Sequence, residues 1–191
     1  NYTGEIKLTW SITAREVTPV IEVADGSYVY DEGKEIKPAI TVEDDLGNII
    51  DPKEYEVSYS NNTNAGTAAT VTVTDKSGGN YVLGTASKTF QIAKANSTAI
   101  APTANDLTYN GTEQTLVTAG TANGGTMVYS QSEDGTYTAE IPNGKNAGDY
   151  TVWYKVQGDD NHNDTTVDSV SVTIKQAKVT VTAENKSSCV G

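Results

Sequence analysis

Hydrophobic and polar residues alternate with a period of two along much of the chain, the pattern of strands that bury one face. The alternation is clearest in the segments 6–12, 36–42, 55–59, 69–73 and 150–156. No window combines apolar spacing of three and four residues with the capping residues that begin and end a helix. Clusters of Gly, Asn and Asp separate the alternating runs. The pattern therefore predicts an all-β chain with essentially no helix, folded as a sandwich or a barrel.

The sequence also repeats itself, with a period of about 80 residues. The triplet Asn64-Ala65-Gly66 returns as Asn146-Ala147-Gly148, and each is followed by an alternating strand pattern. A second pattern occurs three times and ends at Ile12, Ile92 and Ile174. A fixed period of this length is typical of a tandem array of small domains, because each unit is long enough to enclose its own core.

The repeat predicts four segments. Residues 1–14 are interpreted as the last strand of a truncated upstream repeat, and residues 15–95 as the first complete domain. Residues 96–178 form the second domain, and residues 179–191 begin a further repeat. Two domains of this size bury modest cores, so moderate stability is expected for each.

Two features break the regularity of the repeat. The second domain carries an insertion, residues 132–142, which has no counterpart in the first and predicts an additional hairpin. The leading strand, residues 2–13, has an apolar edge but no domain of its own. We expect it to pair with residues 179–182 or with an edge strand of a neighbouring molecule.

The charge of the chain excludes some partners. The formal net charge is −12, and the isoelectric point is near 4.4. Such a surface repels nucleic acid phosphates and anionic lipid head groups, so neither nucleic acid binding nor membrane insertion is expected. No apolar run is long enough to cross a membrane. The single cysteine, Cys189, rules out an intrachain disulfide.

Several motifs resemble known domains. Residues 146–152 (Asn-Ala-Gly-Asp-Tyr-Thr-Val) resemble the entry to strand F of immunoglobulin-like domains, where a Tyr folds its hydroxyl back on the corner. The second unit is similar to the immunoglobulin-like repeats of large bacterial cell-surface proteins. This similarity is carried by Tyr109-Asn110-Gly111, Tyr129-Ser130, Asp134-Gly135, Ile141-Pro142, Tyr154-Lys155-Val156, Gly158-Asp159 and Asn161-His162. The first unit resembles a sister repeat through residues 55–66. Residues 179–187 resemble the opening of another, with Cys189-Val190-Gly191 where a Tyr-Gly is usual.

The resemblance implies two tandem immunoglobulin-like β-sandwich domains, with β-grasp-like repeats as the alternative architecture. The sandwich is preferred because a β-grasp needs a crossing helix. The implied setting is extracellular, on a bacterial cell surface or in a secreted protein. There the chain would be a non-catalytic spacer whose partners are neighbouring repeats of the same parent chain. Two alternatives stay open: an adhesion module that binds a glycan or a host protein through residues 132–142, and an accessory domain of an extracellular hydrolase.

Catalysis is not expected from this sequence. His162 is the only histidine and lies in a polar loop, while Cys189 is close to the C-terminal end. Neither residue belongs to a motif that would supply a nucleophile, a base and an orienting acid. Acidic residues number 25, so pairs of carboxylates arise by chance and carry no weight.

Aromatic residues supply the candidate ligand-binding positions. The chain has 11 Tyr and two Trp against one Phe, and Tyr and Trp are common platforms for sugar rings and protein contacts. Trp153, Tyr137 and Tyr129 are the candidates, with Trp153 pointing to the face opposite Tyr150. The competing interpretation is that Trp153 packs beneath the insertion.

An acidic loop supplies the candidate metal ligands. Asp159, Asp160 and Asp164 lie close together in the sequence, and Ca²⁺ takes six to eight oxygen ligands from such loops. The spacing matches no known calcium loop. The competing interpretation is a solvated turn, in which Asp is favoured for its backbone preferences. The same interpretation applies to the turn at residues 44–48.

Overall fold

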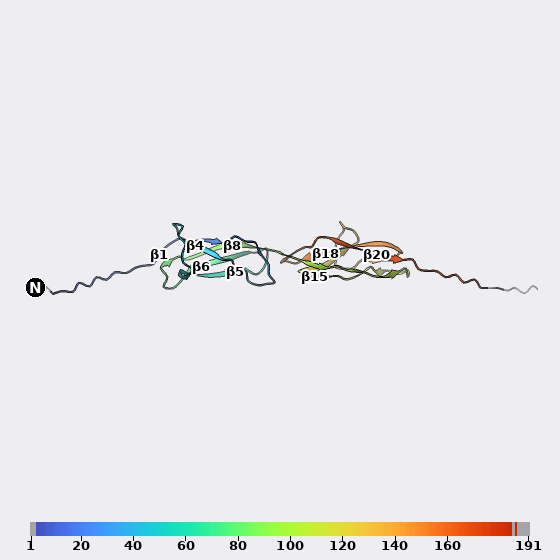
Figure 1. Cartoon of the computed structure of the whole chain (residues 1–191), viewed down its shortest axis with the longest axis horizontal. Helices are drawn as coiled ribbons and strands as arrows, with labels where there is room; N and C mark the ends of the chain where they lie inside the picture. Colours follow the sequence, from blue (N-terminus) through green and yellow to red (C-terminus); the bar gives the residue numbers. More distant parts are fainter. Residues whose placement is uncertain (1–2, 185, 187–191) are drawn as a thin grey trace, which may run out of the picture. The chain divides into compact units, whose positions relative to one another are not determined.

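The computed structural model describes residues 3–184 and 186. The chain is all-β, with no α-helix among these residues, as the hydrophobic alternation predicts. Contacts divide it into two compact units, residues 1–95 and 96–191 (Figure 1). The multiple sheets are consistent with a β-sandwich. The first unit encloses two buried clusters of apolar side chains, and the second encloses one.

The main sheet of the first unit has four strands. Their order across the sheet is β3 (Tyr28–Val29), β8 (Thr85–Ala93), β6 (Ala68–Asp75) and β5 (Tyr55–Ser60). β3 is parallel to β8, and the other neighbours are antiparallel.

The rest of the first unit consists of two short ladders and a single turn of 3₁₀ helix. β2 (Val20–Val23) pairs antiparallel with β4 (Ile40–Glu43), and β1 (Arg15–Glu16) pairs parallel with β7 (Tyr81–Val82). The 3₁₀ turn, η1 (Pro52–Glu54), leads into β5 and is capped by the Asp51 carboxylate, which accepts from the Lys53 amide.

The second unit has a main sheet of the same kind. Its order is β12 (Leu107–Thr108), β20 (Asp168–Lys175), β18 (Gly148–Gly158) and β16 (Gly125–Ser130). Again the short first strand is parallel to the last strand, and the other pairs are antiparallel.

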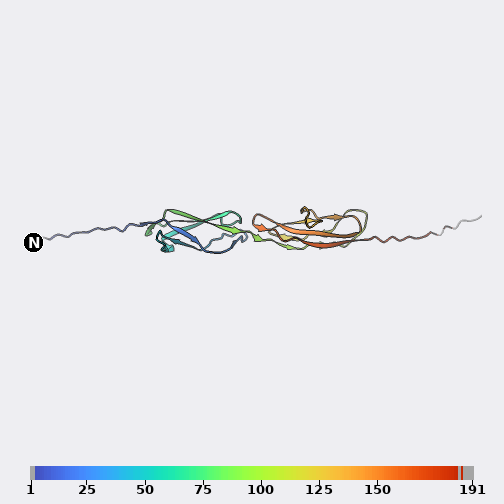
Figure 2. The same ribbon diagram turned by 90° about the horizontal axis from the view of Figure 1, so that it is seen from above.

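Short antiparallel ladders complete the second unit. These are β10 (Thr98–Ile100) with β15 (Thr121–Asn123), β11 (Thr103–Ala104) with β14 (Val117–Thr118), and β13 (Gln114–Thr115) with β17 (Asn143–Gly144). β9 (Ala95–Asn96) and β19 (His162–Asn163) form the remaining two-stranded sheet. Figure 2 gives a second view of both sets of strands.

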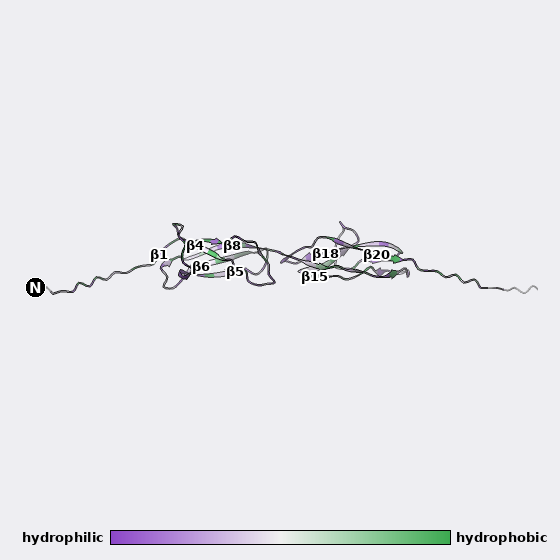
Figure 3. Ribbon diagram, in the orientation of Figure 1, coloured by the Kyte–Doolittle hydropathy of each residue, from purple (hydrophilic) through white to green (hydrophobic). Residues whose placement is uncertain are grey.

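The two main sheets share their register as well as their order. Tyr28 pairs with Ile92 in the first unit, and Leu107 pairs with Ile174 in the second. Both isoleucines are buried. The apolar stretches drawn green in Figure 3 fall on strands in both units, because every second residue of a strand faces the core.

The ends of the described chain are not part of either core. Residues 3–14 form no ladder with any described residue, and Ile6, Leu8, Trp10 and Ile12 are 81–87% exposed. Residues 176–184 are likewise without regular structure. The pairing expected for the leading strand stays a prediction. Alternation predicts which face of a strand is apolar. A ladder also requires the backbone groups of a neighbouring strand as hydrogen-bond partners.

The insertion differs from its expected form. Residues 132–142 contain no strand of their own, so the predicted additional hairpin is wrong in that detail. A tight turn, with the Gly135 amide donating to the Ser132 carbonyl, returns the chain to β16. There Thr138 makes one isolated bridge with Tyr129. The backbone groups of Thr138 bond to β16 instead of to a second strand within the insertion.

Candidate functional site

The outer face of β18 in the second unit carries the candidate Trp153. Val152, Tyr154 and Val156 alternate with it and are buried in the core. Trp153 and Lys155 therefore lie on the opposite face, where both are partly buried. This face is the place to look for ligand contacts in the second unit.

The insertion covers part of this outer face. Ser130 and Val128 pair across the strands with Trp153 and Lys155, and they are only 7% and 4% exposed. The backbone at Gly135 lies so close that a Cβ there would come within 2.5 Å of Ser130 Oγ. A larger residue at this position would require the Ser130 side chain to move.

Tyr137 is held in place rather than free at the tip of the insertion. Its hydroxyl donates to the Glu133 carbonyl at 2.9 Å, and its ring lies 5.6 Å from Lys155 Nζ in a cation–π geometry. Burial raises the pKa of Tyr137, and the neighbouring Glu133 carboxylate raises it further. Lys155 also forms an ion pair of 2.8 Å with Asp164. These contacts join the insertion to β18 and to the loop that follows it.

Tyr129 lies on the other side of the sheet. It is 4% exposed within the core, and its hydroxyl accepts a hydrogen bond of 3.1 Å from the Gly120 amide. A ring buried in this way has no face available for stacking on a ligand. Of the three aromatic candidates, the structure places Trp153 and Tyr137 outside the core and Tyr129 within it.

The acidic loop uses its carboxylates for internal hydrogen bonds. Asp159 Oδ1 accepts from the Asn161 amide at 2.8 Å and lies 2.7 Å from His162 Nδ1. The contact with His162 is the main reason why the pKa of Asp159 is lowered. Asp164 accepts from Lys155 and from the Gly158 amide at 2.9 Å.

These bonds orient the proposed calcium ligands towards protein donors. Asp160, the third of them, is exposed. Across residues 3–184 and 186, no group of three or more His, Cys, Asp or Glu side chains is placed to hold a metal ion together. The geometry therefore adds no support to a cation site formed by Asp159, Asp160 and Asp164.

His162 fills a structural position. Its ring lies against Gly124, whose φ is +82° and where a Cβ would come within 2.6 Å of the imidazole. The next residue, Asn163, presents its carbonyl 2.6 Å from Ser97 Oγ. Close packing against Gly124 and the Asp159 contact fix the position of this ring. Cys189 lies outside the described residues.

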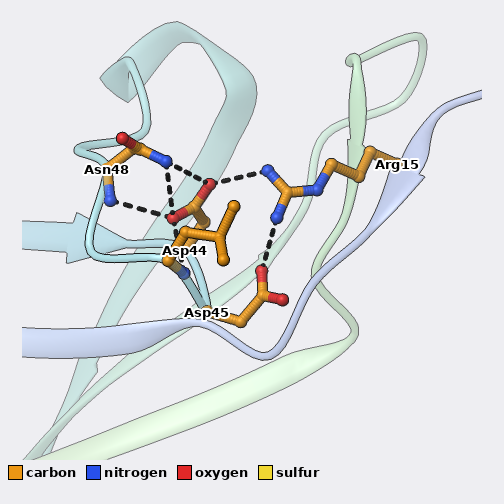
Figure 4. Close-up of polar contacts among 5 residues, drawn as sticks. Arg15, Asp44, Asp45 and Asn48 are labelled. Atoms are coloured by element: carbon orange, nitrogen blue, oxygen red, sulfur yellow. Dashed lines mark hydrogen bonds and ion pairs between the residues drawn. The ribbon is translucent and has the colours of Figure 1, made fainter.

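Sequence reasoning missed the most connected polar group of the first unit. Figure 4 shows the Arg15 guanidinium between two carboxylates, 2.7 Å from Asp44 Oδ2 and 2.7 Å from Asp45 Oδ1. Asp44 is only 3% exposed and also accepts from the amides of Leu46 and Asn48, both at 2.9 Å.

These bonds hold the pKa of Asp44 well below its usual range, with the Asn48 amide as the largest cause. Asp44 therefore anchors the start of the first unit, while the rest of the turn, residues 45–48, stays exposed as expected. One signal was available in the sequence: Arg15 is the only arginine of an acidic chain. Arginine is the residue best suited to bridge two carboxylates.

A tyrosine hydroxyl closes a corner in each unit. Tyr150 donates to the Asn146 carbonyl at 2.9 Å, four residues earlier, and Tyr28 does the same to Ala24. Both rings also pack against core clusters. Each bond fixes the loop that leads into a strand of the main sheet.

Comparison with known proteins gives no identification. No protein-family model matches the sequence, and no curated protein matches it either. Among the described residues, no helix has the length and apolar character to traverse a membrane. The function must therefore be argued from the two units themselves.

Proposed function

We propose that this chain is a non-catalytic spacer segment of a bacterial cell-surface or secreted protein, built from tandem immunoglobulin-like repeats. The observation that carries the proposal is the arrangement shared by the two main sheets. In each sheet, a short early strand lies at one edge and is parallel to the last strand of the unit. Two further strands lie beyond the last strand across the sheet, and both pair antiparallel. The Tyr150 corner adds support, since such a corner is a feature of immunoglobulin-like domains.

This strand order suits a segment that carries load. Pulling on a unit from its two ends draws the early strand and the parallel last strand in opposite directions along their length. The backbone bonds between them, such as Tyr109 amide to Lys175 carbonyl at 2.8 Å, are then loaded together in shear. Tyr30 and Ala93 make the corresponding bond of 2.9 Å in the first unit.

The exposed apolar ends fit the same proposal. Ile6, Leu8, Trp10 and Ile12 follow the pattern that ends at Ile92 in β8, and they are uncovered in this chain. In an array, residues 1–14 would complete the preceding repeat and residues 179–191 would begin the following one. Burial of such a side chain is favourable by about 1.5–3 kcal/mol.

Single-molecule force spectroscopy tests the spacer role. The chain, held at both ends, should unfold in two separate events. Each would release roughly 220–250 Å from the segments Tyr28–Ala93 and Leu107–Lys175. The substitution Tyr109→Pro removes the amide that bonds Lys175, so it should lower the force of one event only. Tyr109→Phe keeps the amide and is the matched control. Unfolding without force peaks would contradict a load-bearing role.

A second candidate function is ligand binding on the outer face of the second unit. It is favoured by the grouping of Tyr137 with Lys155 near the partly exposed Trp153. Titration of Trp fluorescence with soluble polysaccharides and mucin, using Trp153→Ala as the control, tests it. Only Trp10 remains in the control, so a saturable change that disappears there would arise at Trp153 and indicate binding on this face. The partial burial of both aromatic rings makes this the weaker proposal.

A further inference from the structure

The two main sheets differ at one edge. β5 is the outermost strand of the first and β16 of the second, each paired on its inner side with a long antiparallel strand. The other edge of each sheet is the short parallel strand β3 or β12. β5 and β16 are six residues long, so they form the longer outer edges of the two sheets.

The insertion covers the edge of the second sheet. The Tyr129 amide donates to the Thr138 carbonyl at 2.7 Å, and the Thr138 amide returns a bond of 3.0 Å to the Tyr129 carbonyl. Tyr129 therefore turns its backbone groups away from β18 and towards the insertion. Thr138 occupies the place that an added strand would take.

The edge of the first sheet has no such cover. Only a short loop, residues 61–67, connects β5 to β6, and no backbone bond from another described strand reaches the outer side of β5. β5 also lacks the usual protection of an edge, since it contains no Lys and no Pro. Glu56 is its only charged residue, and Val57 is exposed.

We propose that β5 of the first unit pairs antiparallel with β5 of a second copy of this chain. By its place in the sheet, Val57 corresponds to Tyr129, because Val57 pairs with Val73 as Tyr129 pairs with Tyr154. Val57 and, two residues later, Tyr59 therefore turn their backbone groups outward. A two-fold axis at Val57 would then align each strand with itself. The main sheets of the two copies would join into one.

The side chains of β5 fit this pairing. Around an axis at Val57, Glu56 lies opposite Ser58 of the second copy, and Tyr55 lies opposite Tyr59. Like charges directly opposite each other would destabilise the pairing, and this register contains none. The occupant is thus a second copy because the strand is complementary to itself.

The charge of the chain sets the conditions for association. Two copies with a net charge of −12 repel each other, and salt screens that repulsion. The dimer fraction should therefore rise with ionic strength, whereas an association held by ion pairs would weaken.

Sedimentation equilibrium of the whole chain at 50 and 300 mM NaCl, over a wide range of concentration, tests the proposal. Ser58 is exposed, and its substitution leaves the core intact. Ser58→Glu places two carboxylates opposite each other at two symmetric positions and should raise the dimer Kd. Ser58→Lys places opposite charges there and should lower it, each by roughly 2- to 30-fold. Loss of folding cannot produce these opposite signs.

Deletion of residues 1–14 separates this proposal from the competing occupant of the edge, the leading strand. The dimer should survive the deletion. A chain that stays monomeric throughout, or a dimer that ignores both Ser58 substitutions, would overturn the proposal. So would a dimer that requires residues 1–14.

Discussion

The substitution Ile174→Ala should destabilise the second unit strongly and leave the first unchanged. Ile174 is 1% exposed and belongs to a core that also contains Leu116, Val152 and Val172. Its neighbours are held by strands on both sides of β20, so they have little freedom to fill the space left behind. The loss should therefore combine the transfer of the removed atoms with the cavity that remains.

The expected magnitude is large relative to the stability of one unit. Replacing a buried Ile by Ala costs about 2–5 kcal/mol. A domain of this size is stable by roughly 4–12 kcal/mol, at about 0.05–0.15 kcal/mol per residue. A loss of about 3 kcal/mol would lower the unfolding midpoint by about 12–24 °C.

Tryptophan fluorescence can follow the second unit alone. Trp153 lies in β18, whereas Trp10 is highly exposed in the leading segment and should change little on unfolding. A Trp10→Phe background leaves Trp153 as the only reporter. Thermal unfolding in this background should show the lowered midpoint directly.

The matched control is Ile92→Ala, at the same place in the first unit. Ile92 is 2% exposed and pairs with Tyr28 as Ile174 pairs with Leu107. The substitution Ile92→Ala should leave the unfolding midpoint reported by Trp153 unchanged. It should lower the unfolding midpoint of the first unit, which calorimetry would detect. If Ile92→Ala moved the Trp153 signal as far as Ile174→Ala, the cores would not unfold independently. A shift of less than about 1 kcal/mol for Ile174→Ala would refute the packing argument.

Three further substitutions probe individual contacts. Tyr150→Phe removes the hydroxyl that bonds the Asn146 carbonyl and should cost the second unit about 1 kcal/mol in urea unfolding. An unchanged midpoint would mean that the bond contributes nothing net. Gly144→Ala would place a Cβ 2.9 Å from a Leu116 methyl, so overpacking should cost about 1–3 kcal/mol in the same assay. The low pKa of Asp44 adds stability above about pH 4 that is lost as pH falls further. Asp44→Asn should lessen this acid-side loss in thermal scans of the first unit, and an unchanged pH dependence would contradict it.

Strand character and the facing of each strand can be predicted from the order of residues alone. Alternation identifies Val152, Tyr154 and Val156 as one face and Trp153 as the other, because successive residues of any strand point to opposite sides. The Tyr150 hydroxyl bond spans only four residues, so a local motif was enough to suggest it. These are short-range properties that depend little on the rest of the fold.

Which faces and edges are covered depends on contacts between segments that lie far apart in the sequence. Tyr129 and Tyr137 are equally aromatic in the sequence, yet Tyr129 is buried in the core. Tyr137 instead packs with Lys155, because the insertion folds back onto β16. The Arg15–Asp44 pair joins residues 29 positions apart, a separation that no local pattern reports. Burial and long-range pairing depend on which segments meet in space. Periodicity specifies how each strand faces, but packing decides what it meets.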